Sequence, residues 1–140
     1  AVGSAREIEC GVLVDADGIP QASRCAEIIV NERHEFYDFA AKYLDDSATL
    51  VVPAQLPDGV EETVRAMAVR AFEALDCEGL ARADFFVQPD GRVIVNEVNT
   101  MPGFTSISMF PRMWAVTGVD YAGLVDRLVA DALRKGTGLH

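Results

Sequence analysis

GLARADFFVQPDGRVIVNEVN, residues 79–99, is the stretch that decides the fold. Two runs rich in β-branched and aromatic residues flank Pro89, Asp90 and Gly91, a combination typical of a tight turn. We therefore expect an antiparallel hairpin, with one strand over residues 80–88 and the other over residues 92–98. The polar side chains of these two strands are the first candidates for a functional site.

The length of the turn determines which side chains of the hairpin face one another. A two-residue turn at Asp90 and Gly91 and a four-residue loop over residues 89–92 give the same register. A three-residue loop would shift the strands by one residue and move Asp84 away from the face of Glu97. Two of these three turns agree, so we expect their register. It pairs Gln88 with Val93, Phe86 with Val95, Asp84 with Glu97 and Arg82 with Asn99.

Four polar side chains of this register converge at the open end of the hairpin. They are Arg82, Asp84, Glu97 and Asn99. The opposed carboxylates repel by roughly 0.2–1 kcal/mol, and a divalent cation would offset that repulsion. Two carboxylates with an amide oxygen form the all-oxygen set that suits Mg²⁺. The alternative is a solvated hairpin face on which Arg82 neutralises Asp84. On the metal interpretation, Asp84→Asn should not destabilise the cation-free fold.

The segments around the hairpin complete one domain. Apolar alternation predicts strands over residues 6–14 and 20–30, joined by a turn at 15–18, and a short strand over 50–52. Spacings of three and four predict helices over 60–75, with a core-facing stripe, and over 121–135, capped by Asp120 and ended by Gly136. Residues 31–49 lack a regular period and favour a long ordered loop. This order predicts an α+β domain with an antiparallel sheet and packed helices.

The segment after the hairpin continues from the polar cluster. Pro102 and Gly103 predict a turn in which the Gly103 N–H could face a developing oxyanion. Residues 106–109 look like a helix start, and free N–H groups there can bind a carboxylate. The alternative is that a serine of this segment caps the helix through its hydroxyl group.

Composition excludes several other classes of function. Twelve basic and 22 acidic residues give a net charge of −10 without a basic cluster, which argues against nucleic acid and anionic membranes as partners. No apolar run approaches the roughly 20 residues of a membrane span. Cys10, Cys25 and Cys77 form no CxxC pair, so we expect reduced structural thiols in a cytoplasmic protein.

GLARADFF and VIVNEVNTMPGFTSISMFPRMW resemble the C-terminal part of the D-alanine–D-alanine ligases of the ATP-grasp superfamily. The resemblance runs from about Arg6 to the end of the chain. It implies that Asp84, Glu97 and Asn99 hold two Mg²⁺ ions on the ATP phosphates, with Mn²⁺ able to replace them. It also implies a catalytic arginine and an oxyanion-binding glycine, and a site for the carboxylate of the second D-alanine. Those roles fall on Arg82, on Gly103, and on Ser108 with Met109.

Earlier segments extend the resemblance to the nucleotide. Glu7 matches a glutamate that binds the ATP ribose, although an exposed strand glutamate would look the same. Residues 36–44 resemble a mobile loop in which Lys42 reaches the γ-phosphate and Tyr43 helps to close the substrate site. Phe86 could pack against adenine, or could be an ordinary core phenylalanine.

The resemblance implies ATP-dependent ligation of two D-alanines through an acyl phosphate, for peptidoglycan synthesis in the cytoplasm. Residues 1–140 would be the C-terminal part of an ATP-grasp ligase domain, without the N-terminal domain and most of the central domain. We therefore expect the isolated chain to be inactive, and the full-length enzyme could be a homodimer. The alternatives are a D-alanine–D-lactate or other D-alanine–D-X ligase, and a non-catalytic nucleotide-binding module. The pair Lys42 and Tyr43 favours the dipeptide-forming type.

Overall fold

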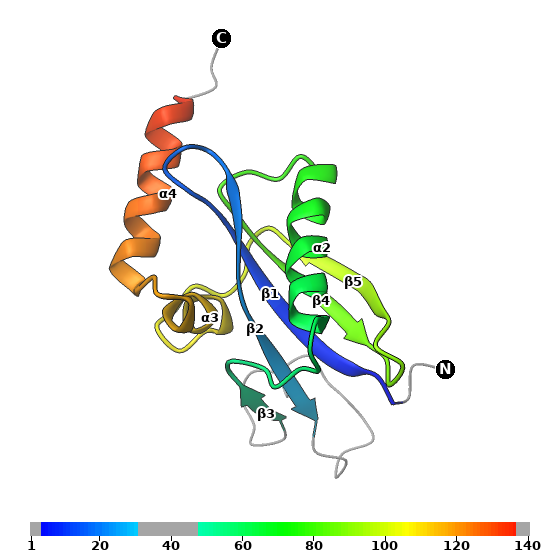
Figure 1. Cartoon of the computed structure of the whole chain (residues 1–140). Coiled ribbons are helices and arrows are strands. Elements are labelled where there is room, and N and C mark those ends of the chain that lie inside the picture. The colour runs from blue at the N-terminus through cyan, green and yellow to red at the C-terminus, as the bar shows by residue number, and fades with distance from the viewer. Residues whose placement is uncertain (1–3, 31–47, 137–140) are drawn as a thin grey trace.

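The computed structural model describes residues 4–30 and 48–136 and confirms the α+β class (Figure 1). The strands are β1 (Arg6–Val14), β2 (Pro20–Val30), β3 (Ala48–Val51), β4 (Leu80–Val87) and β5 (Val93–Asn99). They form one antiparallel sheet in the order β3-β2-β1-β4-β5. The helices are α2 (Val60–Ala74), α3 (Met109–Thr117) and α4 (Tyr121–Lys135). Most of the loop predicted over residues 31–49 lies outside the described residues.

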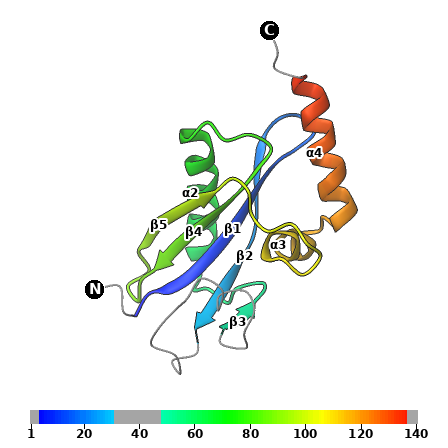
Figure 2. The same ribbon diagram turned by 180° about the vertical axis from the view of Figure 1, so that it is seen from behind.

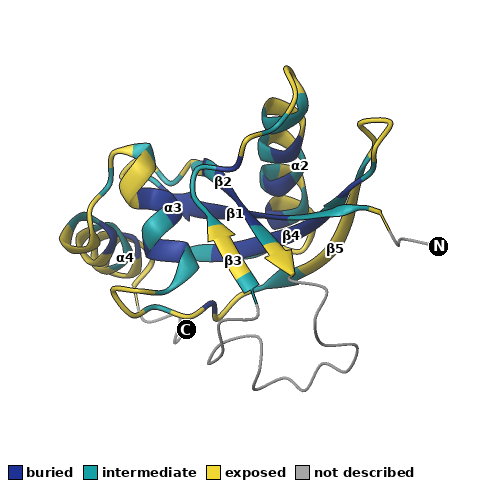
Figure 3. Ribbon diagram, turned by 90° about the horizontal axis from the view of Figure 1, so that it is seen from below, coloured by how far each residue is buried: buried dark blue, intermediate teal, exposed yellow. Residues whose placement is uncertain are grey.

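Strand β1 forms the centre of the sheet and the most buried part of the fold. Every residue from Ile8 to Val14 is buried, whereas the edge strands β3 and β5 are mostly exposed (Figure 3). Strand β3 begins at Ala48, two residues before the predicted start. The site described below lies where the buried β1 and β4 meet the exposed β5.

Helix α2 covers one face of the sheet. Its Val64, Ala68 and Phe72 are buried in a cluster with the side chains that alternate along β1, as the periodicity predicts. Leu75, which belongs to the predicted apolar stripe, is 63% exposed because it follows the last turn of the helix as the C-cap residue. The other face of the sheet therefore remains available to the remaining elements.

Helix α4 runs beside the β1–β2 turn, and α3 lies beside the middle of these two strands (Figures 1 and 2). Leu13 of β1, Phe110 and Trp114 of α3 and Leu124 of α4 form a second core cluster. A Cβ on Gly11 would lie 2.9 Å from Trp114 Nε1 and 3.0 Å from the Phe110 ring. The missing side chain at Gly11 thus lets α3 approach the backbone of β1, and this approach fixes where α3 begins.

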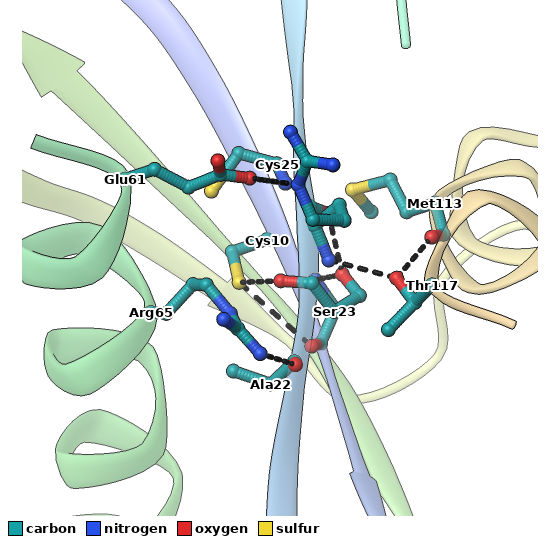
Figure 4. Close-up of polar contacts among 10 residues, drawn as sticks. Cys10, Ala22, Ser23, Cys25, Glu61, Arg65, Met113 and Thr117 are labelled. Atoms are coloured by element: carbon teal, nitrogen blue, oxygen red, sulfur yellow. Dashed lines mark hydrogen bonds and ion pairs between the residues drawn. The ribbon is translucent and has the colours of Figure 1, made fainter. Parts of the chain in front are cut away.

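A β-bulge in the β1–β2 pair connects both helical layers (Figure 4). Opposite the bulge, the Gly11 N–H donates to Ser23 Oγ at 2.9 Å. The Arg24 N–H donates to Thr117 Oγ1 of α3 at 2.8 Å, and Arg24 Nε donates to Glu61 of α2 at 2.8 Å. One residue of β2 therefore holds a helix on each side of the sheet.

Cys10 and Cys25 are directly opposed across β1 and β2, and both are fully buried. All three cysteines are free thiols, as expected. The hydrogen bond with Cys10 and burial raise the pKa of the Cys25 thiol far above its ordinary value. The Cys25 thiol is therefore protonated. Its contact with Cys10 cannot be read from the sequence, because the two cysteines lie far apart along the chain.

The outer surface of α4 carries a row of exposed apolar side chains. Val125, Val129 and Leu133 repeat every four residues and are 41%, 52% and 78% exposed.

Asp120 caps helix α4 by accepting from the Gly123 N–H at 2.8 Å, and Gly136 ends the helix, both as predicted. Within residues 4–30 and 48–136, the helices are too short or too polar to cross a bilayer.

Candidate active site

The β4–β5 hairpin has the predicted pairs at its open end and different pairs near its turn. Arg82 pairs with Asn99 and Asp84 pairs with Glu97, as expected. The turn, however, is the three-residue loop: the Gln88 N–H donates to the Arg92 carbonyl at 2.9 Å. Gly91 in this loop has φ +85°, a conformation that suits glycine. The predicted pairs Phe86–Val95 and Gln88–Val93 are wrong, because Val87 pairs with Val93, Phe86 with Ile94 and Phe85 with Val95.

A β-bulge between these two regions restores the register at the open end. Phe85 pairs with Val95 and Asp84 pairs with Glu97, so Asn96 is an extra residue in β5. A three-residue turn alone would have placed Glu97 on the wrong face. The added residue reverses that shift. The facing carboxylates thus depend on two irregularities that compensate one another.

Arg82 lies among three carboxylates on this face of the sheet. Asp84 binds it through both oxygens, at 2.8 Å to Nε and 2.8 Å to Nη2. Glu9 Oε1 lies 3.6 Å from Arg82 Nε, and Glu97 Oε1 lies 3.9 Å from Arg82 Nη2. Arg82, Asp84 and Glu9 are buried, with exposures of 6%, 8% and 5%. Among the described residues, one guanidinium therefore faces three carboxylates.

The Arg82–Asp84 ion pair of the alternative interpretation is present, but the face that carries it is not solvated. A bidentate pair at this depth is stronger than an exposed one, because little water screens it. Only Glu97 of the group is open to solvent, with 57% of its side chain exposed. The Glu97 carboxylate is thus accessible from the β5 side, where an external cation could reach it.

Glu9 belongs to this site although the sequence analysis assigned it no role. It pairs with Asp84 across β1 and β4. The alternation of side chains along a strand could have revealed it. Ile8 and Cys10 face the core under α2, so Glu9 must face the opposite side of the sheet together with Glu7.

A cavity of about 360 Å³ opens beside Arg82. Its polar wall is formed by Glu9, Arg82, Gly103, Thr105 and Ser108, and its apolar wall by Ile28, Leu50, Ile107 and Met109. The structure thus brings four residues with predicted substrate roles, Arg82, Gly103, Ser108 and Met109, to one hollow. The hollow is large enough for a small amino acid.

Ser108 occupies the N-cap position of α3 but does not cap it with its side chain. Its Oγ accepts from the Thr105 N–H at 3.0 Å and lies 2.7 Å from Thr105 Oγ1. A Cβ on Gly103 would lie 3.1 Å from the same Oγ atom. Ser108 is therefore the N-cap residue that the serine alternative expected, but its hydroxyl group holds the loop that carries Gly103 and makes no cap hydrogen bond to α3.

Contacts at both ends hold the loop between β5 and α3. Asn99 Oδ1 accepts from the Met101 N–H at 2.9 Å. Phe104 packs against Phe110 and Tyr121 with ring centroids 6.0 and 5.4 Å apart, and the Tyr121 hydroxyl group donates to the Phe104 carbonyl at 2.6 Å. Contacts on both sides of Gly103 therefore hold the loop that carries it.

The residues predicted to bind ATP lie partly in the same region. Glu7 and Phe86 are paired across β1 and β4, and both line a small cavity that also touches Asp84. Lys42 and Tyr43 lie outside the described residues. The structure thus brings Glu7 and Phe86 next to the carboxylate cluster.

The predicted ligand residues suit a cation chemically. Asp84, Glu97 and Asn99 supply two carboxylates and an amide oxygen, the hard donors that Mg²⁺ accepts. In the described ranges, no group of three or more His, Cys, Asp or Glu side chains is arranged to hold a metal ion. Arg82 engages both oxygens of Asp84. A cation would have to share that carboxylate with the guanidinium.

Comparison with known proteins places these residues in a family. The family described as D-ala D-ala ligase C-terminus matches residues 1–130. The D-alanine–D-alanine ligase of Nocardia farcinica is 61% identical over 136 residues, which cover 96% of this chain and 37% of that protein. The chain thus spans little more than a third of the length of the relatives that it matches.

Solved structures agree with this match. The D-alanine–D-alanine ligase of Coxiella burnetii has a TM-score of 0.78 and 39% identity, over 94% of this chain and 33% of that one. The VanG D-Ala:D-Ser ligase of Enterococcus faecalis has a TM-score of 0.74 and 35% identity, over 89% and 35%. The Bacillus anthracis D-alanine–D-alanine ligase, solved with ATP, has a TM-score of 0.72 and 32% identity, over 93% and 40%. The chain belongs to the D-alanine–D-alanine ligase C-terminal family.

Proposed function

We propose that this chain is the phosphate-binding and acyl-transfer part of an ATP-dependent D-alanine–D-alanine ligase. The observation that carries the proposal is the convergence of Arg82, Asp84, Glu97 and Asn99 beside a cavity lined by Gly103 and Ser108. Family membership gives this convergence its chemical meaning. The reaction joins two D-alanines and belongs to peptidoglycan synthesis.

ATP and magnesium are assigned to the carboxylate end of the hairpin. Asp84, Glu97 and Asn99 would hold two Mg²⁺ ions, with Mn²⁺ as a substitute, and the ions neutralise phosphate charge when they are bound. Glu7 would bind the ribose, and Phe86 would lie against adenine. The pairing of Glu7 with Phe86 beside Asp84 supports this assignment. Lys42 would reach the γ-phosphate.

The chemistry requires two steps. The carboxylate of the first D-alanine attacks the γ-phosphorus of ATP, which forms an acyl phosphate and releases ADP. The amine of the second D-alanine then attacks the acyl carbon, loses a proton and expels phosphate. Arg82 and the Gly103 N–H stabilise the oxyanion between attack and expulsion, where one donor is typically worth about 2.7–4 kcal/mol. Ser108 and Met109 hold the carboxylate of the second D-alanine, and Tyr43 helps to close the site.

The whole reaction needs more protein than these 140 residues. The chain covers 37% of its Nocardia farcinica relative, so we assign it to the C-terminal part of a longer ligase. The isolated chain should make no dipeptide from ATP and D-alanine. A reaction that consumes ATP fits the cytoplasm, and the three free thiols suit that compartment.

The proposal is tested in a complete ligase, either the parent protein or a chimaera in which residues 1–140 replace the matching part of the Nocardia farcinica enzyme. ADP release should depend on D-alanine and Mg²⁺. Glu97→Gln should lower it at least about tenfold, the scale seen for residues that support metal sites. Asp90→Asn is the matched control, because Asp90 is an exposed carboxylate on the same hairpin that pairs only with the turn.

Two results would overturn the proposal. Nucleotide binding without D-alanine-dependent ADP release would indicate a non-catalytic module. Normal ADP release by Glu97→Gln would remove the metal role from this hairpin. A D-alanine–D-X ligase remains the second candidate, because the VanG D-Ala:D-Ser ligase shares the fold at 35% identity.

A further inference from the structure

Glu9 is a buried carboxylate without a role in the proposed reaction. It is 5% exposed, pairs with Asp84 across the sheet, and lies 3.6 Å from Arg82 Nε. It also lines both the 360 Å³ cavity and the smaller cavity beside Glu7. Burying a carboxylate is unfavourable unless it compensates a positive charge. Among the residues that the structure describes, the guanidinium of Arg82 offers such a charge.

In the proposed reaction, Arg82 must keep its position at the cavity wall when Asp84 also binds a cation. Asp84 now holds Arg82 Nε and Nη2 at 2.8 Å each. In the proposed function the same carboxylate also binds a cation. Two positive charges on one carboxylate repel each other, and the hold of Asp84 on Arg82 weakens. A second anionic partner would then keep the guanidinium at the cavity wall.

In the described part of the chain, two carboxylates besides Asp84 approach Arg82. Glu97 lies 3.9 Å from Nη2, but its side chain is 57% exposed and is itself a proposed metal ligand. Glu9 approaches Nε from the neighbouring strand β1, and only 6% of its side chain is exposed. Solvent and salt therefore screen Glu9 much less than Glu97.

We propose that Glu9 is a positioning residue that holds the Arg82 guanidinium at the cavity wall while Asp84 binds the cation. Glu9 acts through Arg82 and need not touch substrate. The inference rests on the proposed function, because that function gives Asp84 its second task.

Steady-state kinetics of Glu9→Gln in the complete ligase is the first test. The kcat should fall about tenfold or more, while the KM for D-alanine and the affinity for Mg-ATP stay within about threefold of wild type. Glu9→Asp keeps the charge and should recover part of the loss. If Glu9→Gln does not fold, Glu9→Asp alone is measured, and its kcat should fall by less than about tenfold but clearly below the wild-type value. A wild-type kcat in Glu9→Asp would then overturn the inference.

Glu27→Gln is the matched control. Glu27 is 7% exposed and binds Arg6 at 2.7 and 2.6 Å, so it is a buried carboxylate in an arginine pair of the same sheet, although the Arg6 side chain is 35% exposed. It pairs with Ile8, a residue of the core under α2, and so lies on the opposite face from the site. Glu27→Gln should lower the melting temperature and leave kcat near the wild-type value.

The second readout is the ¹⁵N–¹H signal of Arg82 Nε, assigned with Arg82→Lys. In the wild type it should stay sharp when Mg²⁺ and a non-hydrolysable ATP analogue are added. In Glu9→Gln it should broaden only after that addition. Identical behaviour in both proteins, or unchanged kcat in Glu9→Gln, would overturn the inference.

Two further outcomes have distinct meanings. A raised KM for D-alanine with unchanged kcat would overturn the positioning role and make Glu9 a substrate-binding residue. An inactive wild type would remove the proposed function, and the Arg82 signal would then decide alone whether Glu9 anchors the guanidinium when cation and nucleotide bind.

Discussion

The Asp84→Asn substitution distinguishes two interpretations of the facing carboxylates Asp84 and Glu97. In one, they repel each other without compensation, and in the other, Arg82 already compensates their charge. The asparagine side chain is neutral and has one acceptor oxygen, so it cannot reproduce two charge-assisted bonds at 2.8 Å. Removing one partner of a buried ion pair costs about 3–5 kcal/mol. Glu9 and Glu97 retain part of that interaction, and relief of the repulsion returns about 0.2–1 kcal/mol. The net destabilisation should be about 2–3 kcal/mol, contrary to the expectation from sequence alone.

Thermal melts of the chain in EDTA measure this effect. At roughly 3 °C per kcal/mol for a domain of this size, the melting temperature should fall by about 6–9 °C. Asp90→Asn is the control: its ion pair with Arg92 is 2.9 Å long, close to the 2.8 Å between Asp84 and Arg82, but both side chains are exposed, so the melting temperature should hardly change. An Asp84→Asn melting temperature equal to or above that of the wild type would refute the role given to Arg82.

Three further predictions concern the framework of the site. Gly11→Ala should destabilise the fold by about 1–3 kcal/mol and alter the fluorescence of Trp114, because the new Cβ would lie 2.9 Å from its Nε1 atom. Iodoacetamide at pH 8 should label Cys77 first and Cys25 last, as mapped by mass spectrometry, because the hydrogen bond with Cys10 and burial raise the pKa of Cys25; rapid Cys25 labelling in the folded protein would contradict this. Burial raises the pKa of Glu61, but hydrogen bonds from Arg24 and the Cys25 N–H outweigh it and hold that pKa below 4.5. The stability that this carboxylate supplies should therefore be present above pH 4.5 and lost as pH falls further, and acid melts of Glu61→Gln should lack that loss.

The hairpin shows how far local sequence patterns reach. Alternation placed the polar groups of Arg82, Asp84, Glu97 and Asn99 on one face, and those pairs are confirmed. The reason given for the register was nevertheless wrong. The turn has three residues, and the bulge at Asn96 cancels the resulting shift. Both residues adjoining Asn96 have ordinary strand character, so alternation alone could not reveal the extra residue.

Contacts between distant strands account for most of what the sequence did not show. Cys10 meets Cys25, and Glu9 meets Arg82, only because β1 lies between β2 and β4. Strand order depends on packing across the whole sheet, whereas periodicity reports one strand at a time. The roles of Lys42 and Tyr43 stay predictions, since both lie outside the described residues.

Product analysis of the complete ligase tests the central claim most directly. The enzyme is incubated at neutral pH with ATP, Mg²⁺, D-alanine and an equal concentration of D-lactate, and the products are identified by mass spectrometry. D-Alanyl-D-alanine should form in proportion to ADP and should exceed any ester product. Predominant ester, or ADP without a condensed product, would contradict the assignment of this chain to a D-alanine–D-alanine ligase.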